Sequence, residues 1–133
     1  MSTSRPLGLS RRGWLALALL SLLIQLWLLY SARPPTPVSF PYSDKLAHFC
    51  MFGGVAGLFV LAGVRRSWVL LASLAHAAVS ELVQWRGIHG RSGSPWDFLA
   101  DVAGIAAALW LASRIRAWRP DQHSNPLRHI PRR

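Results

Sequence analysis

A histidine and a pair of opposite charges enter an otherwise apolar stretch, SDKLAHFCMFGGVAG, at residues 43–57. Asp44 and His48 lie four residues apart, so on a helix they share one face, and Lys45 lies at the same depth. Carboxylate, ammonium and imidazole groups can bind polar ligands or transfer protons. The stretch therefore predicts a membrane-spanning helix whose first turns are polar.

Two further predicted helices each carry a pair of polar side chains. Glu81 and Gln84 lie three residues apart, and Asp97 and Asp101 lie four residues apart, so each pair shares a helix face. Adjacent carboxylates repel one another unless a cation neutralises them. The available cations are Lys45, Arg86, Arg91 and a protonated His48. A ligand-binding site shared by several helices is the hypothesis that these residues favour.

Structural roles are the alternative for some of these side chains. Asp44 and Asp97 lie in predicted first helical turns, where the helix dipole favours a carboxylate. Glu81 and Asp101 lie deeper, where no capping role explains them. His76, nearer the middle of its helix, suits a hydrogen bond between helices.

The chemistry of the site stays open between binding and catalysis. Glu81 and Asp97 are the candidates for a general base, with Arg91 contacting a phosphate group. His48, Glu81, Asp97 and Asp101 could in principle hold a divalent metal, but no local ligand motif has diagnostic spacing. We therefore predict neither a metal ion nor another cofactor.

Composition and charge distribution predict a membrane protein. The chain has 133 residues, of which 52% are hydrophobic, and a net charge of +10. Four stretches of about 18 to 20 residues carry almost no charge, which is the length that crosses ~30 Å of hydrocarbon. The arginines flank these stretches instead of forming one surface, which excludes nucleic acid as a partner. The single cysteine, Cys50, excludes an intramolecular disulfide.

The predicted fold is all-α, a polytopic bundle of four transmembrane helices within residues 13–113. The predicted spans are residues 13–30, 45–64, 68–85 and 96–113. A basic N-terminus precedes them at residues 1–12, and a basic, disordered tail is expected at 114–133.

Local signals predict where these spans begin and how they are joined. Four prolines in residues 31–42 indicate an extended linker, Ser43 is the expected N-cap of the second span, and Ser94 with Pro95 predicts the start of the fourth. Ser10 to Leu15, SRRGWL, is similar to a twin-arginine export signal. No soluble domain follows it, so a retained first span is preferred.

The distribution of Lys and Arg predicts the orientation. Eleven of the 15 basic residues lie in the N-terminus, the turn at Arg65 and Arg66, or the tail, so both termini should be cytoplasmic. Four of the five acidic residues then come to the outer side, together with Lys45, His48 and Arg91.

Three motifs in order on successive predicted helices resemble the VanZ-like membrane family. They are DKLAHF with a following Phe and Gly at 44–54, ELVQ at 81–84, and GRSGSPWDFLADVAG at 90–104. The last motif often ends in Asn in that family, where this chain has Asp101. The matched positions are Asp44, Lys45, His48, Glu81, Gln84, Arg91, Asp97 and Asp101. The resemblance implies a protein of the bacterial cell envelope, in a family named for a member associated with resistance to glycopeptide antibiotics.

We therefore expect an inner-membrane protein whose outer-leaflet site recognises an anionic lipid headgroup or a lipid-linked cell-envelope precursor. A membrane hydrolase or transferase acting on a phosphate-containing envelope lipid is the first alternative. A structural partner subunit is the second. Small-xxx-small faces at Gly53 and Gly57, and at Ala100, Gly104 and Ala108, could also mediate homo- or hetero-oligomers.

Overall fold

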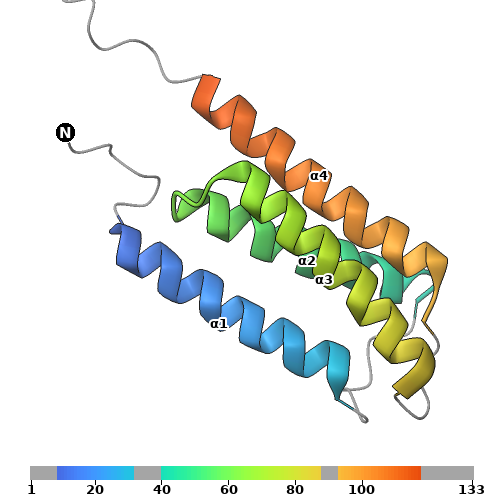
Figure 1. Cartoon of the computed structure of the whole chain (residues 1–133). Helices are drawn as coiled ribbons and strands as arrows, with labels where there is room; N and C mark the ends of the chain where they lie inside the picture. The colour runs from blue at the N-terminus through green and yellow to red at the C-terminus, as the bar shows by residue number, and fades with distance from the viewer. Residues whose placement is uncertain (1–8, 32–39, 88–92, 118–133) are drawn as a thin grey trace, which may run out of the picture.

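The computed structural model describes residues 9–31, 40–87 and 93–117, and all regular structure in these ranges is helical. The four helices are α1 (Arg11–Tyr30), α2 (Ser43–Leu61), α3 (Arg66–Gly87) and α4 (Pro95–Ala117). They lie roughly along one direction, with α1 and α4 on opposite sides and α2 and α3 between them (Figure 1). The prediction of an all-helical fold is confirmed.

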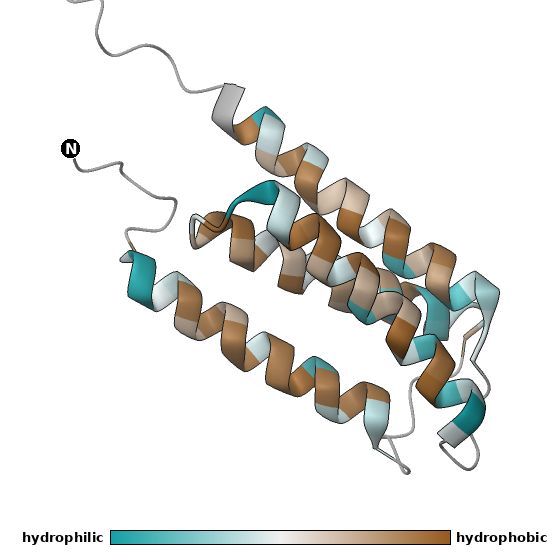
Figure 2. Cartoon of the chain, in the orientation of Figure 1, coloured by the Kyte–Doolittle hydropathy of each residue, from teal (hydrophilic) through white to brown (hydrophobic). Residues whose placement is uncertain are grey.

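Three of the described helices are long and apolar enough to cross a membrane: α1, α2 and the part of α4 from Pro95 to Ile115. Apolar residues cover most of their length in Figure 2. α3 has 22 residues but is not among the three. Its polar side chains lower its hydropathy, and they are Arg66, Ser67, Ser73, His76, Ser80, Glu81, Gln84 and Arg86.

Both ends of α1 and its buried face follow from local sequence. Ser10 is the N-cap, and its Oγ accepts a hydrogen bond from the Gly13 N–H at 3.2 Å. Trp14, Ala18, Gln25 and Leu29 are buried at helical spacing along one side. This side faces the other helices.

α2 begins and ends differently from the prediction. Its N-cap is Tyr42, which has a left-handed φ of 65°, so Ser43 is the first helical residue and the expected Ser43 cap is wrong. The helix ends at Leu61, before the predicted span limit of Val64, because Gly63 adopts a φ of 87° that favours glycine. The Gly63 N–H donates to the Val60 carbonyl at 3.0 Å and closes the turn.

The start of α4 follows the prediction. The Trp96 N–H donates to Ser94 Oγ at 3.3 Å, and the Phe98 N–H donates to the Ser94 carbonyl at 3.1 Å. The helix continues to Ala117, so the first residues of the predicted disordered tail are helical. Residues 118–133 lie outside the described part of the chain.

α2 and α4 run parallel and pack more extensively than any other described pair of helices. A Cβ atom on Gly53 would lie 2.9 Å from the Gly104 carbonyl oxygen, and one on Gly57 would lie 3.7 Å from Ala108 Cβ. The two small-residue faces therefore meet within the chain. Oligomers through these faces stay a prediction, and they would compete with this packing.

The parallel direction of α2 and α4 requires the chain between them to return along the bundle. α3 makes this return and runs antiparallel to both (Figure 1). The hydrophobic core lies between the helices and includes Leu29, Phe52, Ala56, Val60, Val69, Ala77, Ile105 and Ala112. Consequently the C-terminal ends of α1 and α3 and the N-terminal ends of α2 and α4 lie at one end of the bundle.

The close approach of α2 and α4 predicts that Gly104→Ala destabilises the protein by about 2 kcal/mol, because the added Cβ would overlap the Phe49 carbonyl oxygen. Gly54→Ala is the matched control, since nothing lies within 4 Å of a Cβ at that position. Alanine is the better helix former, so the control should be equally or more stable. Thermal unfolding in detergent measures both. Equal destabilisation of the two variants would contradict the packing at Gly104.

Candidate functional site

Six of the eight predicted site residues form one cluster at the end of the bundle where α2 and α4 begin. We call this group the polar cluster, and it consists of Asp44, Lys45, His48, Glu81, Asp97 and Asp101. α2, α3 and α4 each contribute to it. The segment between α3 and α4 includes residues 88–92, which lie outside the described ranges.

Lys45 forms the outer part of the polar cluster. Its Nζ lies 2.7 Å from Asp44 Oδ2 and 3.1 Å from Asp97 Oδ1, so it joins the first turns of α2 and α4. The Asp44 side chain is 57% exposed, whereas that of Asp97 is 10% exposed. Asp97 therefore belongs to the buried part of the cluster, and Asp44 lies at its rim.

His48 occupies the inner part. Its Nδ1 lies 2.9 Å from Asp101 Oδ1 and 3.8 Å from Glu81 Oε1. All three residues are largely buried, and Asp101 is fully buried. A carboxylate buried to this degree needs a cation, a proton or hydrogen-bond donors to offset its loss of hydration.

Glu81 is held in place by the chain that leads into α4. Its Oε2 accepts a hydrogen bond from the Ser94 backbone N–H at 2.7 Å. Its Oε1 is buried and has no hydrogen-bond partner in the described residues. The same is true of Asp101 Oδ2. Two acceptor oxygens of the cluster are thus available to a donor or a cation.

One other predicted site residue, Gln84, lies outside the cluster. Gln84 is buried and its Nε2 donates to the Leu29 carbonyl at 3.0 Å, which links α3 to the end of α1. This contact gives Gln84 a structural role between helices. Arg91 lies outside the described residues, so the predicted phosphate contact from its side chain stays a prediction.

The described cluster carries more negative than positive groups, with four carboxylates, one ammonium group and one imidazole. His48, Glu81 and Asp97 each offer one ligand atom, and these atoms lie within 4.8 Å of one another. The sequence expectation of no metal relied on the lack of a local motif. The three side chains come from three helices, so no local motif could reveal their proximity.

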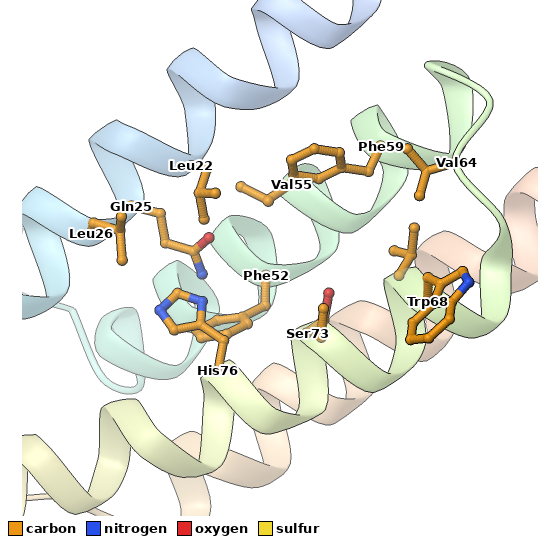
Figure 3. A pocket seen from close by; sticks show the side chains of 12 residues that line it. Leu22, Gln25, Leu26, Phe52, Val55, Phe59, Val64, Trp68, Ser73 and His76 are labelled. Carbon is orange, nitrogen blue, oxygen red and sulfur yellow. The ribbon is translucent and has the colours of Figure 1, made fainter.

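An apolar cavity of about 490 Å³ lies beside the polar cluster, between α1, α2 and α3 (Figure 3). Its volume is within the range of small-molecule sites. Apolar side chains form most of its wall, together with the polar residues Gln25, Ser73 and His76. Gln25 is only 2% exposed, and neither of its amide atoms has a partner in the part of the chain described here.

Phe52 separates this cavity from the polar cluster. Its ring is nearly parallel to that of His48, with centroids 6.5 Å apart, and lies 5.2 Å from the His76 ring in the cavity. Sequence analysis did not place Phe52 or Gln25 in a site. Gln25 is the most polar residue of the apolar first span, and this feature of the sequence could have indicated the cavity.

Comparison with known proteins gives no relative: no family model, no curated protein and no solved structure matches the chain.

The buried contact between His48 and Asp101 predicts that His48→Ala destabilises the protein by about 3 kcal/mol, because it leaves the Asp101 carboxylate buried without its partner. Asp44→Asn is the control. Its exposed pairing with Lys45 should contribute less than about 0.5 kcal/mol. Thermal unfolding in detergent, extrapolated to a common temperature, measures both. If the two variants lose the same stability, His48 does not compensate Asp101.

Proposed function

We propose that this chain is a four-span protein of the bacterial inner membrane that binds a phosphate-bearing envelope lipid. The buried part of the polar cluster, together with Lys45, would hold the lipid headgroup, and the apolar cavity would hold part of its chain. The observation that carries this proposal is the position of Phe52, which contacts His48 of the cluster on one side and lines the cavity on the other. A polar and an apolar site so close together suit an amphiphile.

The membrane assignment is supported by side chains that face away from the bundle. Large apolar residues are well exposed on every helix, and they include Leu20, Leu23, Trp27, Leu46, Leu71, Trp85, Trp96 and Leu111. In water such a surface would be costly, whereas lipid accommodates it.

The direction of the helices supports a fourth span. If α2 and α4 both span the membrane in the same direction, the chain must cross back between them. α3 is the helix that makes this connection, and its Glu81 and Gln84 face protein groups. Burial within the bundle explains how α3 crosses with a lower hydropathy than its neighbours.

The charge distribution predicts that both termini are cytoplasmic, which puts the polar cluster at the outer leaflet. A C-terminal fusion to green fluorescent protein should therefore fluoresce, and a C-terminal fusion to alkaline phosphatase should be inactive. A fusion after residue 90 should show the opposite pattern. Active phosphatase at the C-terminus would show the opposite topology, with the polar cluster on the cytoplasmic side.

Lys45 and the carboxylates suit different parts of a headgroup. The ammonium group has three N–H donors, of which Asp44 and Asp97 accept two, so one donor stays available for a phosphate oxygen. Glu81 Oε1 and Asp101 Oδ2 suit hydroxyl, amide or ammonium donors. A phosphate that also carries such donors is therefore favoured over a simple anion.

The three motifs that resemble the VanZ-like family support the same proposal. They contain all six residues of the polar cluster. We propose membership of that family on this basis, with an effect on glycopeptide susceptibility as the associated phenotype.

A membrane hydrolase or transferase is the second candidate function. Glu81 favours it, because one carboxylate oxygen is oriented by the Ser94 N–H while the other has no partner in the described structure. Asp97 is the weaker general base, since its Oδ1 contacts Lys45. Glu81 would accept a proton from an attacking hydroxyl group.

Lipid binding at this site predicts that Glu81→Gln and Asp101→Asn each weaken lipid retention at least tenfold, because they keep the shape of the side chain but remove a charged acceptor for the headgroup's hydrogen-bond donors. The protein would be placed in nanodiscs and its bound lipids measured by native mass spectrometry. A polyprenyl phosphate and phosphatidylglycerol serve as separate probes, which distinguishes a precursor carrier from a phospholipid. Phosphate release from the same probes tests the enzyme alternative.

Control variants separate binding from folding. Asp44→Asn should retain lipid normally, because Asp44 lies at the exposed rim. Val55→Phe would fill part of the cavity and should reduce retention of the long-chain probe, whereas Leu23→Phe on the exposed side of α1 should not. Antibiotic sensitivity and membrane abundance are measured in parallel. If Glu81→Gln and Asp101→Asn lower abundance and phenotype in step, the cluster is structural and the chain is a partner subunit.

A further inference from the structure

The inner part of the polar cluster combines side chains from three helices around a small volume. His48 Nδ1 contacts Asp101 Oδ1 at 2.9 Å and lies 3.8 Å from Glu81 Oε1. Ligand atoms of His48, Glu81 and Asp97 lie within 4.8 Å of one another. This group supplies one imidazole and two carboxylates, which is a ligand set typical of divalent transition metals.

The distances suit metal coordination. Ligand atoms around a tetrahedral Zn²⁺ with bonds of about 2.1 Å are about 3.4 Å apart. His48 Nδ1 and Glu81 Oε1 lie 3.8 Å apart, close to this spacing. The ligand atoms of His48, Glu81 and Asp97 lie within 4.8 Å of one another, so side-chain rotations that move them by about 1.4 Å or less would bring them to it.

Two buried oxygens point to a missing partner. Asp101 is fully buried, and its Oδ2 has no hydrogen-bond partner among the residues in view. Glu81 Oε1 has none there either, although Glu81 Oε2 is fixed by the Ser94 N–H. Such oxygens are rare without a donor or a cation, because desolvation costs are high.

We propose that His48, Glu81 and Asp97 bind one divalent transition-metal ion, of which Zn²⁺ is the best probe. The imidazole favours Zn²⁺ over Mg²⁺ and Ca²⁺, which prefer oxygen ligands alone. Asp101 Oδ1, which lies 2.9 Å from His48 Nδ1, orients the imidazole. The Ser94 N–H keeps Glu81 oriented for the ion.

Metal binding also changes what the cluster attracts. The four carboxylates weaken the attraction of Lys45 for a phosphate, and a divalent ion offsets two of the excess negative charges. An open coordination position on the ion then accepts a phosphate oxygen. Only this last step depends on the proposed lipid-binding function.

The test is a Zn²⁺ titration of the full chain in detergent without added lipid, followed by isothermal calorimetry and by metal analysis after dialysis. His89, His123 and His129, which lie outside the described residues, are replaced by Asn in every sample to remove competing imidazoles. One Zn²⁺ per chain is expected. Glu81→Gln and Asp97→Asn should each weaken its affinity at least tenfold, while Asp44→Asn should not change it.

The thermal stability of the protein with Zn²⁺, EDTA or Mg²⁺ tests the same site. Zn²⁺ should raise the melting temperature of the protein with the intact cluster, EDTA should reverse the rise, and excess Mg²⁺ should not reproduce it. The proposal is overturned if the chain shows no saturable binding of one Zn²⁺ ion. It is also overturned if Glu81→Gln and Asp97→Asn bind Zn²⁺ with the same affinity as Asp44→Asn. Zn²⁺ binding without Zn²⁺-dependent lipid retention would support the metal site and reject the lipid step alone.

Discussion

The close parallel packing of α2 on α4 is the constraint on which the rest of the structure depends. Gly53 and Gly104 let the two backbones approach within van der Waals contact, and larger side chains would hold them apart. This approach brings Lys45 to Asp97 and His48 to Asp101. It also requires α3, which connects the two parallel helices in sequence, to run antiparallel to them, and this carries Glu81 to the same end. The polar cluster is therefore a product of backbone packing.

Sequence patterns predicted much of this arrangement because they depend on local physics. The apolar runs defined four helices, and the spacing of Asp44 with His48 and of Asp97 with Asp101 defined the polar faces. The topology then brought these faces to one end. The start of α4 at Ser94 and Pro95 was also predictable, since capping involves only neighbouring residues.

Other features depend on contacts between distant residues and could not be predicted in this way. Gln84 lies three residues after Glu81 and was therefore predicted on the same helix face as the site. Its Nε2 instead donates to the Leu29 carbonyl of α1. The short distances among His48, Glu81 and Asp97 depend on how three separate helices pack, although the shared site itself was predicted. The cavity beside Phe52 depends on how α1 lies against the other helices. The backbone of Tyr42 took the capping position expected for Ser43, because its left-handed conformation allows the turn without a side-chain cap.

The contacts between α2 and α4 also fix how far one helix can slide along the other. Lys45 with Asp97, His48 with Asp101, Gly53 with Gly104 and Gly57 with Ala108 are all separated by 51 to 53 residues in sequence. Small side chains form a smooth surface that offers little resistance to a shift by one turn. The buried pair at His48 and the ion pair at Lys45 would both be broken by such a shift. The same residues that suit a ligand thus also specify the register of the two helices.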